Sequence, residues 1–121
     1  MTQILIVASD EKNFSGFMDG LKQNETVTMI TAGSQDEALD KLSPDLPDLI
    51  VIDEEVDGIS GLAIARNVLM KNAMANQVVV SRLSSEEFHD ASEGLGIMAQ
   101  LPPEPDAAQT KIVLGILGKM P

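Results

Sequence analysis

Short apolar runs recur along the chain at near-regular intervals, at 4–7, 27–30, 49–52, 78–80 and 97–101. Most of these runs are continuous and do not alternate with polar residues. Continuous runs are typical of strands that are buried on both faces, as in a parallel sheet with helices on either side. The pattern therefore predicts five strands of a parallel sheet.

The segments that follow these runs have helical spacing. Phe14, Phe17, Met18 and Leu21 follow the i, i+3, i+4, i+7 pattern of one apolar stripe and predict the first helix. The expected inward residues of the later helices are Ala38, Leu39 and Leu42, then Leu62, Ala65 and Leu69, then Phe88 and Ala91, and finally Ile112, Val113, Ile116 and Leu117. The expected N-terminal caps are Ser34 with Glu37, Ser84 with Glu87, and Asp106.

Strictly alternating strands and helices predict an α/β fold, a three-layer doubly wound five-stranded parallel sheet with right-handed crossovers. In such folds the functional crevice lies outside the carboxyl ends of the strands. The residues expected there are Ala8, Ser9 and Asp10, then Asp53, then Ser81 and Arg82, and finally Leu101 and Pro102. We expect residues 1–121 to form a single domain.

Composition narrows the classes of function. The formal net charge of −11 and the absence of a basic patch argue against direct binding of nucleic acid and favour a positively charged protein partner. No apolar run approaches the roughly 18 residues that would span a membrane, so we expect a cytoplasmic protein. The absence of cysteine excludes disulfides and thiolate metal sites.

Motifs for enzymatic chemistry are absent from the sequence, which contains no catalytic triad, P-loop or zinc-ligand spacing. We therefore do not expect an enzyme. The end of the sequence, just after a predicted helix, suits either a whole protein or one part of a longer chain.

Four stretches carry a specific resemblance: "ILIVASDEKNF", "PDLIVIDEEVDGISGL", "VVVSRLSSEE" and "GLGIMAQLPPEPD". Together they resemble the signature regions of CheY-like receiver domains of two-component response regulators, over nearly the whole chain. The resemblance implies the (βα)5 flavodoxin-like fold with strand order 2-1-3-4-5. It also implies that Asp53 is the acceptor of a phosphoryl group from a histidine kinase and that Ser81 carries the switch hydroxyl. The family often has a cis bond before the proline that matches Pro102.

The metal site of the family is altered in this sequence. Receiver domains usually place two acidic residues directly after the first strand to hold Mg²⁺, and Ala8 and Ser9 stand there instead. Asp10 follows one residue later. The candidate Mg²⁺ ligands are therefore Asp10, Asp53 and Glu55, and a solvated acidic loop is the alternative interpretation of Glu55 and its neighbours.

The cation of the family is also missing, because Leu101 stands where receiver domains have a lysine before proline. Arg82 directly follows the switch hydroxyl, where the family usually has a small residue. Our hypothesis is that Arg82 pairs with Asp53 and substitutes for the lysine. The alternative is that Arg82 points into solvent.

These departures favour an atypical receiver domain with weakened or lost phosphorylation. By resemblance it would bind a histidine kinase or a downstream effector through its fourth helix, fifth strand and fifth helix, with a homodimer as a further candidate assembly. One alternative is a conventional Mg²⁺-dependent phosphoacceptor that uses Asp10 and Arg82 as substitute supports. A second is a flavodoxin-like cofactor binder, although the loop "ASDEKN" has no glycine or threonine cluster to hold a phosphate.

Overall fold

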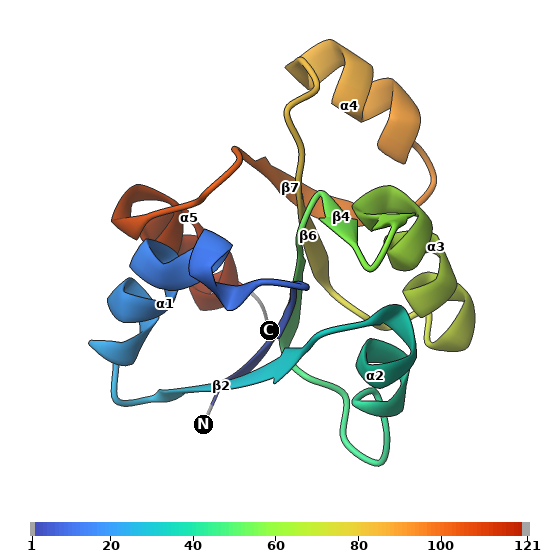
Figure 1. The fold of residues 1–121 in the computed structure, drawn as a ribbon. Coiled ribbons are helices and arrows are strands. Elements are labelled where there is room, and N and C mark those ends of the chain that lie inside the picture. The colour runs from blue at the N-terminus through green and yellow to red at the C-terminus, as the bar shows by residue number, and fades with distance from the viewer. Residues whose placement is uncertain (1, 120–121) are drawn as a thin grey trace.

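A five-stranded parallel sheet forms the centre of the computed structural model, which describes residues 2–119 (Figure 1). Its strands are β1 (Thr2–Val7), β2 (Val27–Ala32), β3 (Leu49–Ile52), β6 (Gln77–Val80) and β7 (Ile97–Leu101). Two further strands, β4 (Glu55–Val56) and β5 (Ile59–Ser60), form a small antiparallel hairpin after β3. The sheet order is β2-β1-β3-β6-β7. This is the predicted order 2-1-3-4-5 once the hairpin is set aside.

Helices cover both faces of the sheet. They are the 3-10 helix η1 (Glu11–Phe14), α1 (Ser15–Lys22), α2 (Gln35–Asp40), α3 (Gly61–Lys71), α4 (Ser85–Ser92) and α5 (Ala107–Gly118). Helices α1 and α5 pack against each other on one side, and α2 and α3 lie on the opposite side (Figure 1). Helix α4 contacts β7 at the edge of the sheet.

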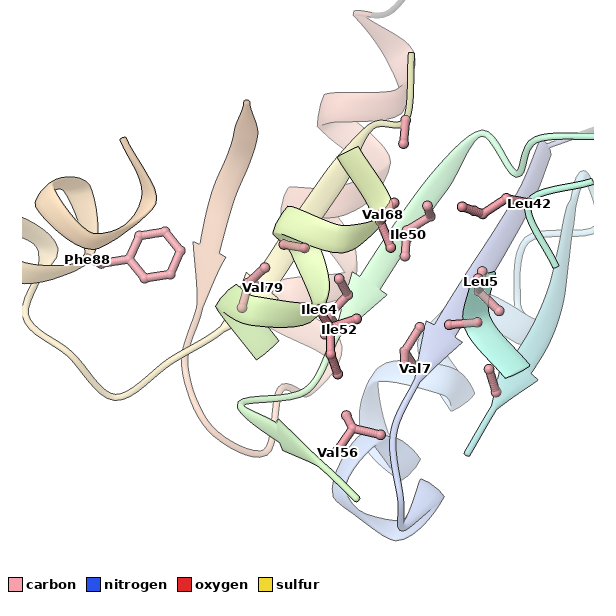
Figure 2. Close-up of a cluster of buried hydrophobic side chains, with 14 residues drawn as sticks. Leu5, Val7, Leu42, Ile50, Ile52, Val56, Ile64, Val68, Val79 and Phe88 are labelled. Carbon is pink, nitrogen blue, oxygen red and sulfur yellow. The ribbon is translucent and has the colours of Figure 1, made fainter. Parts of the chain in front are cut away.

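The apolar core has two layers, one on each face of the sheet. Ile50 and Ile52 point into the layer beneath α2 and α3, which Figure 2 shows together with Ile64 and Val68 of α3. Leu49 and Val51, the alternate residues of β3, belong to the layer beneath α1 and α5. Because both faces of each central strand are covered, both sets of side chains must be apolar, which explains the continuous runs in the sequence.

The predicted helix caps are largely confirmed. Ser84 and Glu87 form the expected capping box at the start of α4, and Asp106 caps α5. The Ser34 hydroxyl accepts the Glu37 N–H, but the Glu37 carboxylate returns its bond to the N–H of Gly33 and not to that of Ser34. The boundaries of these helices thus follow from local polar groups.

Three predictions about helix faces and one about the backbone are wrong, and the first of them is Ala91 of α4, which was predicted inward and is exposed. Helix α3 buries Ile64 and Val68 fully, whereas Leu69, predicted inward, is only partly buried. Apolar residues surround this helix, so spacing alone does not define its inner face. Ile112 of α5 is 50% exposed. Among the described residues, the cis peptide bond precedes Pro44 and not Pro102.

The contact between α1 and α5 depends on a glycine. A Cβ at Gly20 would lie 2.7 Å from the Oγ1 of Thr110, a buried hydroxyl that donates to the Phe17 carbonyl. We expect Gly20→Ala to lower the free energy of unfolding by about 1–2 kcal/mol, because the helices would have to separate. Urea unfolding followed by far-UV circular dichroism measures this, since the chain has no tryptophan or tyrosine.

Gly115 of α5 offers the matched control. A Cβ there would meet no atom within 4 Å. Gly115→Ala should therefore raise the free energy of unfolding by up to about 1 kcal/mol through helix propensity. Equal effects of the two substitutions would show that the helix contact does not restrict position 20.

Candidate functional site

The carboxyl ends of β3, β6 and β7 surround a pocket of about 530 Å³. Its lining residues are Asn13, Asp53, Glu54, Glu55, Val80, Arg82, Pro103 and Glu104. Strand β3 ends at Ile52, so Asp53 is the first polar residue beyond the buried part of the strand. It is 9% exposed, the least exposed carboxylate described. The pocket thus lies where the strand pattern predicts the functional crevice.

The Asp53 carboxylate is held by hydrogen bonds at both oxygens. Its Oδ2 accepts a bond from Asn13 Nδ2 at 3.2 Å, and its Oδ1 accepts the Glu54 N–H at 2.8 Å. The Asp53 N–H donates to the Val7 carbonyl and continues the pairing of β3 with β1. The carboxylate is therefore fixed in orientation by groups of this chain.

Asn13 is a site residue that the sequence analysis missed. It lies in η1, which begins after Asp10, and the Asp10 carboxylate accepts the Lys12 N–H at 3.0 Å as the cap of this short helix. The turn of η1 brings Asn13 toward β3. Aspartate side chains often accept the backbone N–H two residues later and so start a turn. Asp10 could therefore have indicated this turn from the sequence.

The candidate Mg²⁺ ligands are only partly brought together. Asp53 and Glu55 line the same pocket, but Asp10 lines a different hollow between the ends of β1 and β2. The Ser9 hydroxyl accepts the Asp57 N–H at 2.8 Å and ties the loop after β1 to the hairpin. Within residues 2–119, no three acidic or histidine side chains are arranged to hold a metal ion. Mg²⁺ usually keeps several waters and is held by one or two carboxylates, so Asp53 and Glu55 are the two candidate ligands that share a pocket, and Mg²⁺ binding stays a prediction.

Arg82 does not pair with Asp53, so that hypothesis is wrong. The Arg82 Nε donates to Oε1 of Glu54 at 2.6 Å, and the Arg82 backbone N–H donates to Oε2 of the same carboxylate at 2.7 Å. The Arg82 side chain is 75% exposed, so it lies along the surface, with its Nε paired to Glu54. Successive residues after a strand point in different directions, and it is Glu54 that faces Arg82.

Ser81 and Leu101, the other two positions of the predicted site, are buried. Ser81 is 6% exposed, and its hydroxyl accepts the Leu83 N–H at 3.1 Å, which tightens the turn after β6. Leu101 is 1% exposed and packs in the core layer beneath α1 and α5. An apolar side chain thus occupies the position where the resemblance implies a cation.

Carboxylates dominate the electrostatics of the pocket. Asp53, Glu54, Glu55 and Glu104 line it, and Arg82, the cationic lining residue, is paired with Glu54. Glu104 has a φ of 53°, a left-handed backbone conformation that is uncommon outside glycine and that places this residue at the pocket. The excess of negative charge disfavours a further anion unless cations accompany it.

Comparison with known proteins identifies the fold. No protein-family model and no curated protein sequence matches the chain. Among solved structures, the receiver domain of the Francisella response regulator 1452 is similar, with a TM-score of 0.82 and 21% identity over 98% of each chain. The response regulator receiver domain protein (CheY-like) from Methanospirillum hungatei gives 0.81 and 18%, over 98% of this chain and 95% of that one.

The chemotaxis response regulator CheY4 of Vibrio cholerae also gives a TM-score of 0.81 at 18% identity, over 97% of this chain and 98% of its own. No helix among residues 2–119 is both long and apolar enough to cross a membrane. The three likenesses cover nearly the whole chain, each with a TM-score above 0.8. The chain therefore has the fold of CheY-like response-regulator receiver domains.

Proposed function

We propose that this chain is a receiver module of two-component signal transduction that binds a protein partner and depends weakly or not at all on phosphorylation of Asp53. The observation that carries this proposal is the state of Asp53, whose two carboxylate oxygens accept hydrogen bonds from Asn13 and from the Glu54 N–H. The carboxylate stands where the resemblance implies a phosphoacceptor, but both of its oxygens already accept hydrogen bonds within the chain.

The charge of the surrounding pocket supports weak phosphorylation. Attack of a carboxylate on a phosphoryl group brings two anions together, so the reaction needs cations at the site. Here Glu55 and Glu104 add negative charge, Leu101 supplies none of the positive charge of a lysine, and Arg82 is held by Glu54. The pocket therefore lacks most of the electrostatic support for the transfer.

The proposed partner face consists of α4, β7 and α5. Strand β7 is an edge strand, and Met98 on it is 42% exposed. Leu83, in the turn that leads into α4, is 37% exposed. Exposed apolar residues beside an unpaired strand edge suit contact with another protein. We propose a histidine kinase or a downstream effector as the partner, bound without enzymatic turnover by this chain, and a second copy of the chain as the alternative.

Intact-mass analysis after incubation with a small acyl phosphate, with and without Mg²⁺, tests the proposal. We expect the wild-type protein and Asp53→Asn to show the same mass as untreated protein in both conditions. A conventional receiver domain incubated in parallel confirms that the phosphodonor is active. The asparagine variant has nearly the size of the native residue, so it controls for transfer to any other side chain.

The second candidate function is the conventional phosphoacceptor, which the accessible pocket beside Asp53 favours. A Mg²⁺-dependent gain of one phosphoryl group in the wild type, absent from Asp53→Asn, would establish it and overturn the first proposal. In that case the exposed guanidinium of Arg82, which pairs with Glu54 through Nε, would be the cation that lines the pocket beside the added charge.

A further inference from the structure

One carboxylate joins the loop after β3 to the loop after β6. Glu54 follows Asp53 directly, and its two oxygens accept bonds from the Arg82 backbone N–H at 2.7 Å and from the Arg82 Nε at 2.6 Å. The Glu54 side chain is 32% exposed. A carboxylate that uses both oxygens on two donors of one residue forms a directional, charge-assisted contact.

The segment that Glu54 holds is also fixed from β7. The side-chain amide of Gln100 donates to the Ser81 carbonyl at 3.0 Å and to the Leu83 carbonyl at 2.7 Å. The Ser81 N–H donates to the Leu101 carbonyl, as a continuation of the sheet. The turn between β6 and α4 is therefore held on one side by Gln100 and on the other by Glu54.

The donors that Glu54 uses are the ones an anion in the pocket would need. Arg82 and Asp53 line the same pocket, and a backbone N–H beside a guanidinium suits either a carboxylate or a phosphate-type anion, since both present two oxygens to two donors. Glu54 already fills these donors. A second anion beside Asp53 must therefore displace Glu54 from the Arg82 N–H and Nε, or bind only the Nη groups of the exposed guanidinium.

We infer that Glu54 acts as an internal anion that holds residues 81–83 in place and competes with an external phosphate-type anion for Arg82. Glu54 thereby keeps the turn that leads into α4 fixed in the absence of a phosphoryl group. An external anion that displaced Glu54 would release this turn, so the competition is a form of regulation. This inference extends the function proposed above, but the contact itself exists independently of any chemistry at Asp53.

The first test is amide hydrogen exchange of the Arg82 N–H, measured by NMR on unphosphorylated protein. Glu54→Gln keeps the size of the side chain and removes its charge. We expect exchange to become about tenfold faster, because a charge-assisted bond is replaced by a weaker neutral one. Glu55→Gln is the matched control, since Glu55 lines the same pocket and carries the same charge but has no contact with Arg82 among those described.

The second test is a titration with inorganic phosphate at constant ionic strength, followed at the Arg82 amide resonance. We expect Glu54→Gln to bind phosphate about tenfold more tightly than the wild type and Glu55→Gln, because only the first substitution replaces the anion that competes for the Arg82 donors with a weaker neutral acceptor. Far-UV circular dichroism confirms that both variants are folded.

The inference stands only if both measurements change in Glu54→Gln and not in Glu55→Gln. Equal changes in the two variants would indicate a general effect of pocket charge, and no change in either measurement would show that Glu54 does not hold Arg82; each result overturns it. Neither measurement involves a phosphodonor, so failure here is distinct from a positive result in the phosphorylation assay.

Discussion

Gly61→Ala is expected to lower the free energy of unfolding by about 3 kcal/mol, because a side chain at this position would overlap the main chain of the site. Gly61 is the first residue of α3, and a Cβ built there would clash with the carbonyl oxygen of Asp53 and lie 3.1 Å from a methyl group of Val79. A backbone carbonyl next to a sheet strand cannot move aside as a flexible side chain can. The Gly61 N–H also donates to the Glu54 carbonyl at 2.7 Å.

Urea unfolding followed by far-UV circular dichroism measures the loss, with Gly33→Ala as the control. The nearest atom to a Cβ at Gly33 is a carboxylate oxygen of Glu37 at 3.9 Å, so this substitution should change stability by no more than about 0.5 kcal/mol. Amide spectra should also report displacement of Asp53 and Glu54 in the Gly61 variant. A Gly61→Ala protein as stable as the control would show that the loop after β3 moves freely.

The fold could be predicted from the sequence because burial leaves a clear pattern. Strand β3 contributes Leu49 and Val51 to one core layer and Ile50 and Ile52 to the other, so every position is apolar. The caps Ser84 and Asp106 also mark where α4 and α5 begin. The inner face of α3 was predicted only in part: Ala65 is buried as expected, but the apolar residues of this helix are not confined to one side, and Ile64 and Val68 are buried as well.

The site could be predicted in position but not in its pairings. Asp53 follows a buried strand and therefore had to lie at the carboxyl edge of the sheet. Which carboxylate meets Arg82 depends on the directions of Asp53 and Glu54 after the strand ends, and adjacent residues in a loop carry no periodicity that reveals them. Asn13 reaches Asp53 through a short 3-10 turn, which no apolar stripe marks.

The altered residues around Asp53 act together. Asn13 and the Glu54 N–H satisfy its oxygens, Glu54 holds Arg82, and Leu101 belongs to the core. The positions that the resemblance associates with Mg²⁺ or a cation are used in the same way, since Ala8 and Leu101 pack in the core and the Ser9 hydroxyl accepts the Asp57 N–H. A single substitution among the residues around Asp53 would not restore a conventional phosphoacceptor. It can restore one property of such a site, the binding of Mg²⁺.

Asn13→Asp is expected to make the stability of the protein depend on Mg²⁺. The Asn13 amide lies 3.2 Å from Oδ2 of Asp53, so an aspartate there would place two carboxylates side by side, with Glu55 lining the same pocket. Without a divalent cation the two charges repel and the variant should be less stable than the wild type. With Mg²⁺ the same oxygens become a pair of hard ligands.

At a Mg²⁺ concentration ten times the dissociation constant, binding to the folded state alone would stabilise the Asn13→Asp variant by about 1.4 kcal/mol. For a chain of this length that corresponds to a rise of about 5 °C in the melting temperature. Thermal unfolding in MgCl₂ and in NaCl of matched ionic strength measures the difference. Asn13→Ala removes the amide without adding a charge and should melt at the same temperature in both salts. Equal melting temperatures of Asn13→Asp in MgCl₂ and in NaCl would contradict the prediction. They would show that a carboxylate at position 13 does not reach Asp53, and that η1 needs the bond from the Asn13 amide to Asp53 to stay turned toward the pocket.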